Sequence, residues 1–142
     1  MRTTFDRTQR RSGEQGVSTN RGRALLIIAV VFVLAVGSFA AYEYRSAWRV
    51  AHAAAVAIVL GDEISSLGPA DPAYRLRLGS PARDEFTITT DPGWFELSRA
   101  LPINFTVRNT KRPSLPAVHF GVDVELTPSG HWEVIGYGDT GG

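Results

Sequence analysis

The chain has 142 residues, of which 44% are hydrophobic and 20% charged, with 14 Gly and 8 Pro. This composition excludes a wholly disordered chain, a collagen-like repeat and a coiled coil. With no Cys in the sequence, disulfide frameworks, thiolate metal sites and cysteine nucleophiles are excluded as well. The net charge of +1 argues against a dedicated nucleic-acid binder, but residues 1–23 carry six Arg against two acidic residues, a local charge of +4.

Residues 24–42 carry no charged side chain and predict a single transmembrane helix. At about 1.5 Å per residue such a helix is about 28 Å long, close to a hydrocarbon core of about 30 Å. A helix also satisfies its own backbone hydrogen bonds, as a lone segment in lipid must. Tyr42, Tyr44 and Trp48 follow the apolar run, as expected for an aromatic belt at a membrane interface.

The basic residues predict the orientation of this helix. All six Arg of the tail precede the apolar run, and only Arg45 and Arg49 follow it closely. By the positive-inside rule, we expect a cytoplasmic N-terminus and an extracytoplasmic C-terminal domain on the plasma (inner) membrane. The tail, residues 1–23, has too few apolar residues to offset its ordering entropy, so we expect it to be disordered. The alternative is a cleaved signal peptide, because Ser38-Phe39-Ala40 fits a small-x-small cleavage site.

Residues 46–60 are rich in Ala and lack Gly and Pro, which predicts a helical stretch that continues the apolar one. Gly61 follows directly and favours the left-handed conformation that ends a helix. One side of this stretch is apolar and needs a covering layer. That side consists of Trp48, Ala51, Ala55, Ile58 and Val59.

Beyond Gly68-Pro69 the hydrophobic residues alternate with polar ones, as they do in β-strands. A loop interrupts the pattern at Asn109–Pro116, which contains two basic residues and two prolines. We expect short strands at Tyr74–Leu78, Asp84–Thr90 and Trp94–Arg99, a further strand whose inward residues are Ile103, Phe105 and Val107, and a closing hairpin.

The closing hairpin has the clearest local pattern. Apolar and polar residues alternate along its first strand, and Thr127–Gly130 has the composition of a tight turn with Gly in the left-handed position. Closing the chain at this turn pairs Leu126 with Trp132 and Val124 with Val134. Both apolar faces then lie on one side, which specifies the register.

These elements predict an α+β fold, with one helix packed on an antiparallel sheet of about five or six strands. The expected parts are a disordered basic tail (1–23), a transmembrane helix (24–42), an extracytoplasmic α+β domain (43–138) and a flexible C-terminus (139–142).

We expect no enzyme, since the sequence has no motif that activates a nucleophile, cradles a phosphate or binds catalytic zinc. His119, Asp123 and Glu125 share the outward side of one strand, with Glu133 opposite, but nothing in the sequence encloses them. We therefore expect a solvated face there, with no metal and no cofactor.

The residues we expect to contact a partner lie in two places. Trp94 flanks a Pro-Gly turn and points away from its apolar neighbours. The second place is the Asn109–Pro116 loop, whose prolines lower the entropy lost on docking. The expected contacts in this loop are Lys111, Arg112, Pro113 and Leu115.

The order of features also carries a resemblance. The tail and the apolar run lead into an Ala-rich helix that ends at Val59-Leu60-Gly61, and a β-rich part follows, with the segments Leu101–Val107, Val122–Leu126 and Gly130–Val134. This layout resembles the cytochrome c oxidase assembly factor Coa1 family, whose members are similar to the Tim21 intermembrane-space domain. The resemblance implies a non-enzymatic, membrane-anchored accessory domain that contacts subunits of a membrane complex.

We therefore expect a single-pass accessory or interaction protein that binds membrane or envelope proteins and the lipid bilayer, and the resemblance implies a role in assembling a respiratory membrane complex. No nucleic acid or small-molecule substrate is expected. Two alternatives stay open: a small-ligand-binding or enzymatic envelope domain of the NTF2-like type, and a domain secreted after signal-peptide cleavage.

Overall fold

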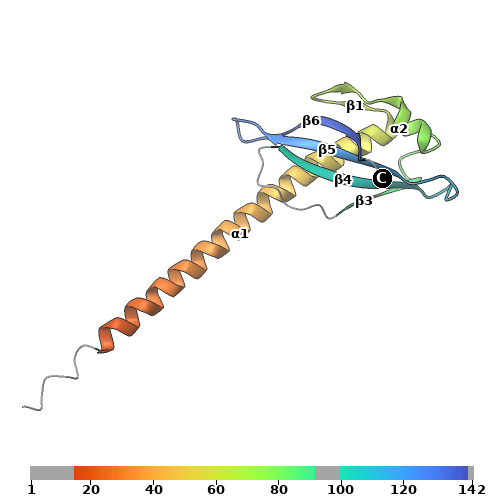
Figure 1. The fold of residues 1–142 in the computed structure, drawn as a ribbon. Helices are drawn as coiled ribbons and strands as arrows, with labels where there is room; N and C mark the ends of the chain where they lie inside the picture. Colours follow the sequence, from red (N-terminus) through yellow and green to blue (C-terminus); the bar gives the residue numbers. More distant parts are fainter. Residues whose placement is uncertain (1–14, 92–99, 141–142) are drawn as a thin grey trace, which may run out of the picture. The chain divides into compact units, whose positions relative to one another are not determined.

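The computed structural model describes residues 15–91 and 100–140, with side chains from residue 21 onward. The chain divides into two compact units, residues 1–42 and 43–142. Helix α1 (Gln15–Leu60) supplies the described part of the first unit and the first element of the second. The remaining elements are β1 (Glu63–Ile64), β2 (Gly68–Pro69), α2 (Pro72–Arg77), β3 (Phe86–Thr90), β4 (Ala100–Asn109), β5 (Val118–Leu126) and β6 (Trp132–Asp139) (Figure 1).

In the first unit, α1 contains the uncharged run at 24–42. Among the described residues it is the one helix long and apolar enough to cross a membrane, judged by length and composition, and none of its most apolar stretch is buried. A signal sequence near an N-terminus has the same properties. The helix already includes residues 15–23, for which the sequence predicts a disordered tail. Adding turns to an existing helix avoids the cost of nucleating a new one.

The second unit has α+β architecture, as the sequence predicts. Its main sheet is antiparallel with the order β3-β4-β5-β6, and β1 and β2 form a separate two-stranded sheet. The expected count of five or six strands in one sheet is therefore wrong for the described residues, which give four. The expected strand at Trp94–Arg99 lies outside the described residues.

The expected strand at Tyr74–Leu78 is instead part of helix α2 and the turn after it. Asp71 caps this helix, because its side chain accepts a 2.9 Å hydrogen bond from the backbone N–H of Ala73. Tyr74 and Leu78 are four residues apart, so both reach the core from one side of a helix, while Leu76 between them is 70% exposed. The alternation of Tyr74, Leu76 and Leu78 is too short to distinguish a strand from a helix, and the cap at Asp71 favours the helix.

The core lies between one face of the four-stranded sheet and two helical segments, α2 and the C-terminal part of α1. The sheet contributes Phe105 and Phe120, whose rings lie 6.2 Å apart and are fully buried. The expected inward row of β4 is confirmed, and so are four of the five residues expected on the apolar side of the helix, the fifth, Trp48, being half-buried. The buried residues of that side are Ala47, Ala51, Ala54, Ala55, Ile58 and Val59. Their small side chains let the helix lie close to the sheet.

The predicted hairpin register is confirmed. Leu126 pairs with Trp132 and Val124 with Val134, and Gly130 has the left-handed φ of 81° that the turn requires. The pairing register shifts by one residue between Asp123 and Val124, because β6 contains one residue more than β5 at this point, as in a β-bulge.

Candidate functional site

The loop after β4, in which the sequence predicts partner contacts, is fixed by Asn109. This side chain is 6% exposed and uses both ends of its amide. Its Nδ2 donates a 2.8 Å hydrogen bond to the backbone carbonyl of Leu78. Its Oδ1 accepts hydrogen bonds of 2.8 Å from the backbone N–H groups of Lys111 and Arg112. The start of the loop is thereby tied to the turn after α2.

The predicted contact residues of this loop differ in exposure. Lys111, Arg112 and Pro113 are exposed, whereas Leu115 is half-buried. Leu115 packs so closely on Gly79 that a Cβ atom added there would lie 2.8 Å from its Cδ1. Leu115 therefore helps to hold the loop in place, and the side chain of Arg112 also lies close to Gly79, whereas those of Lys111 and Pro113 are exposed to solvent or a partner. Trp94, the other predicted contact, lies outside the described residues.

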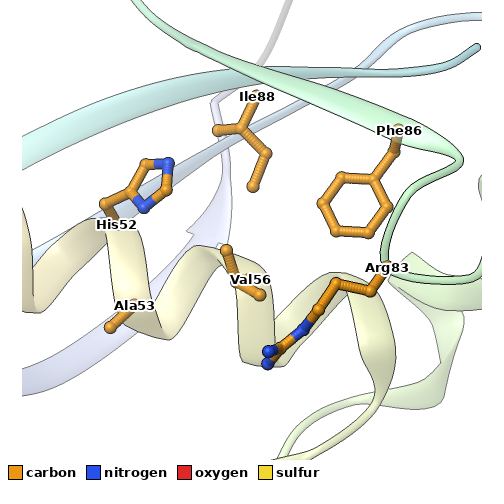
Figure 2. Close-up of a pocket in the computed structure, with 6 residues that line it drawn as sticks. All are labelled: His52, Ala53, Val56, Arg83, Phe86 and Ile88. Atoms are coloured by element: carbon orange, nitrogen blue, oxygen red, sulfur yellow. The ribbon is translucent and has the colours of Figure 1, made fainter.

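A groove that the sequence analysis did not identify runs between α1 and β3. It has a volume of about 490 Å³. Figure 2 shows Phe86 and Ile88 pointing from β3 towards α1 and the side chain of Arg83 reaching across the groove. The lining residues are His52, Ala53, Val56, Arg83, Phe86 and Ile88. The alternation of Phe86 and Ile88 was visible in the sequence, but their position beside a helix depends on the tertiary fold.

A second hollow, of about 390 Å³, lies at the other end of β3. Tyr44, Arg45, Trp48 and Thr90 line it. The indole nitrogen of Trp48 donates a 2.8 Å hydrogen bond to the hydroxyl of Thr90, which fixes this end of the strand to α1. Each end of β3 thus lies beside one exposed guanidinium group, that of Arg45 or that of Arg83.

On the opposite face of the sheet, three polar side chains form a chain of hydrogen bonds. Thr106 donates its hydroxyl proton to Oδ2 of Asp91 at 2.9 Å. Since the hydroxyl has a single proton, Nδ1 of His119, 2.9 Å from the same oxygen, donates to it. In hydrolase triads the imidazole lies between hydroxyl and carboxylate and takes the hydroxyl proton. Here the hydroxyl lies in the middle and Thr106 is 8% exposed, so these hydrogen bonds link β4 and β5 to the residue after β3 without activating a nucleophile.

The described residues contain no group of three or more His, Asp or Glu side chains able to hold a metal ion. Along β5, Asp123 and Glu125 lie on either side of Val124, and Glu125 pairs with Glu133 across the hairpin as predicted. Besides the Lys111–Pro113 surface and the groove along β3, a hollow of about 320 Å³ lies between α1, β1 and the start of β6.

Comparisons with protein-family models, with curated proteins and with solved structures found no match to this chain.

Proposed function

We propose that this chain is a single-pass membrane protein whose residues 43–142 form an extracytoplasmic domain that binds another membrane or envelope protein. In this proposal residues 24–42 stay in the plasma membrane and the N-terminus stays in the cytoplasm. The Coa1-like layout suggests a role as an accessory factor in the assembly of a respiratory membrane complex.

The observation that carries the proposal is the uncovered apolar run of α1. Its large side chains, from Leu25 to Phe39, are each at least half exposed within the described structure. A continuous apolar surface of this size needs a cover, and hydrocarbon chains supply one along the whole circumference of a helix. By contrast, Ala47 is already fully buried in the second unit.

Binding rather than catalysis is supported by the chemistry of the described residues. The Thr106 hydroxyl is engaged by Asp91 and His119, and the two hollows beside β3 are lined mainly by apolar and aromatic side chains, with one arginine in each. An anchored domain meets its partner within the plane of one membrane, so the raised effective concentration makes a modest contact surface sufficient.

The topology is tested with single cysteines, because the natural sequence contains none. A membrane-impermeant maleimide is added to spheroplasts that carry Thr8→Cys or Ser129→Cys. We expect Ser129→Cys to react in intact spheroplasts and Thr8→Cys only after lysis. The reverse pattern contradicts the proposed orientation, and a mature chain that begins near residue 41 contradicts a retained anchor.

The binding role is tested by photo-crosslinking in native membranes, with a photoreactive residue in place of Lys111. The same residue in place of exposed Ser129, in the hairpin turn, is the control. We expect Lys111 to give a discrete protein adduct. If no surface position, including these two, gave a protein adduct, the proposal of an interaction domain would lose its support.

A further inference from the structure

The two edges of the main sheet are covered very differently. The hydroxyl of Ser66 donates a 2.7 Å hydrogen bond to the backbone carbonyl of Val134 on β6. Farther along the same strand, the hydroxyl of Tyr137 accepts a 2.8 Å hydrogen bond from the backbone N–H of Asp71. The β1–β2 segment and the start of α2 therefore contact the β6 edge at Val134 and Tyr137.

The β3 edge has no such cover within the described residues. At both ends of β3, the backbone hydrogen bonds towards β4 involve odd-numbered residues. The carbonyl of Glu85 accepts a 2.8 Å hydrogen bond from the N–H of Thr110, and the N–H of Asp91 donates a 3.0 Å hydrogen bond to the carbonyl of Asn104. Successive residues of an antiparallel strand direct their N–H and C=O groups to opposite sides. The even-numbered residues therefore direct theirs away from β4, to the open edge. These residues are Phe86, Ile88 and Thr90.

The sequence of β3 does nothing to block pairing at this edge. Natural edge strands are commonly protected by charged side chains, prolines or bulges. The five residues Phe86–Thr90 contain no charge, no Pro and no Gly, and their pairing with β4 is regular. An uncharged, regular edge strand of this kind is able to pair with an added strand.

The groove beside this edge indicates which side chains an added strand would carry. Its floor is apolar, formed by Val56, Phe86 and Ile88, and no carboxylate lines it. Arg83 reaches into it with no ion pair among the described residues. A strand added to β3 would direct every second side chain to this floor and the others away from it. An acidic side chain next to Arg83 would gain a charge-assisted hydrogen bond.

We propose that the open edge of β3 and the groove beside it bind an extended peptide segment of a partner protein, with apolar side chains at alternate positions and an acidic side chain next to Arg83. The inference rests on the proposed binding role. It adds the surface that binds the partner and the mode of binding, which is strand addition. A second copy of this chain fits less well, because its own β3 would bring another Arg83 and another Arg45 to a groove that lacks carboxylates.

The test uses the full chain in native membranes, with p-benzoyl-phenylalanine at Ala53, an exposed residue that lines both this groove and the hollow beside β6, so the Arg83→Glu variant below is needed to assign an adduct to the groove. We expect an adduct that mass spectrometry maps to an extended, alternating segment of another protein. Arg83→Glu should lower the yield about ten-fold, since it places a like charge against the acid. Arg108→Glu is the matched control, because it makes the same charge change on the outward face of neighbouring β4 and should leave the yield unchanged.

A peptide with the mapped sequence provides the second readout. Bound to the full chain in nanodiscs, it should slow amide exchange at Phe86, Ile88 and Thr90, while the amides of Thr87 and Thr89, already bonded to β4, change little. Uniform protection, or none, overturns strand addition. A peptide with D-residues at alternate positions is the control that should fail to protect.

The outcomes separate this inference from the proposed function. Partner adducts from Lys111 but none from Ala53 leave the binding role in place and overturn the β3 surface. Adducts from Ala53 that contain only lipid or a second copy of this chain also overturn it. An absence of adducts from every surface position removes both proposals.

Discussion

The indole nitrogen of Trp132 donates a 2.9 Å hydrogen bond to a carboxylate oxygen of Glu43. Glu43 is the first residue of the second unit, and Trp132 is the first residue of its last strand. The bond therefore joins the beginning of the domain to its end. On the β3 side of the same helix, Trp48 makes the corresponding bond to Thr90. Two Trp side chains thus fix the helix to opposite edges of the sheet.

We expect Trp132→Phe to lower the free energy of unfolding by about 1 kcal/mol, because it removes one hydrogen bond to a charged acceptor and keeps most of the apolar contact. Glu43→Ala should cost a similar amount, and the double variant should cost less than the sum of the two. Urea denaturation followed by circular dichroism measures the three values. Glu133→Ala, an exposed neighbour, is the control, and a loss as large as that of Trp132→Phe would contradict the assignment.

Asn109→Ala should destabilise the domain by about 3 kcal/mol, because it leaves a buried carbonyl and two backbone N–H groups without partners. The loop should also open locally, so trypsin should cleave after Lys111 faster than in the natural chain. Thr110→Ala changes an exposed side chain in the same loop and should affect neither quantity. Cleavage at equal rates in all three chains would show that Asn109 does not hold the loop.

Phe105→Ala and Phe120→Ala should each lower the free energy of unfolding by about 3–5 kcal/mol, since both side chains are fully buried between sheet and helix. Leu76→Ala should have an effect below about 0.5 kcal/mol, because this side chain is on the outer side of α2. If Leu76→Ala proved as costly as the Phe variants, the helical assignment of Pro72–Arg77 would be wrong. Thermal and chemical denaturation give these differences.

Burial, and next the negative charge of Asp139, raise the pKa of Tyr74 above its ordinary value of 10.0. The unfolded chain therefore loses this proton at a lower pH than the folded chain does. The stability contribution is fully present below about pH 10 and is lost as the pH rises through the folded-state pKa. We expect Tyr74→Phe to reduce the decline of the urea midpoint above about pH 10. Parallel declines in both chains would assign the effect to other groups.

The elements that could be predicted from the sequence are those with local determinants. The last hairpin carries its own register, because the turn residues and the alternation on both sides agree about which residues pair. The apolar side of α1 from Ala47 to Val59 was likewise readable, since Ala and β-branched residues recur at helical spacing. In both cases the residues that decide the structure are close together in the chain.

The features that escaped prediction depend on residues far apart in the sequence. The short helix α2 is specified by Asp71 and Pro72 and by a core into which Tyr74 and Leu78 fit, and three alternating apolar residues imitate a strand. The groove of Figure 2 exists because β3 lies at the sheet edge next to α1, and no local pattern reveals strand order. Sequence reasoning therefore found the loop at 109–116 but not the surface along β3.

The extra residue in β6 determines on which face of the sheet Tyr137 lies. Val134 pairs with Val124 and Tyr137 with Val122, so three residues of β6 span what two residues of β5 span. That offset turns the ring of Tyr137 inward, where it contacts Tyr74 and its hydroxyl meets Asp71. Without this offset Tyr137, three residues after Val134, would point to solvent, and α2 would lose this contact with the sheet. Insertions in the Thr127–Gly130 turn leave the offset intact, so we expect homologous chains to vary in length at this turn.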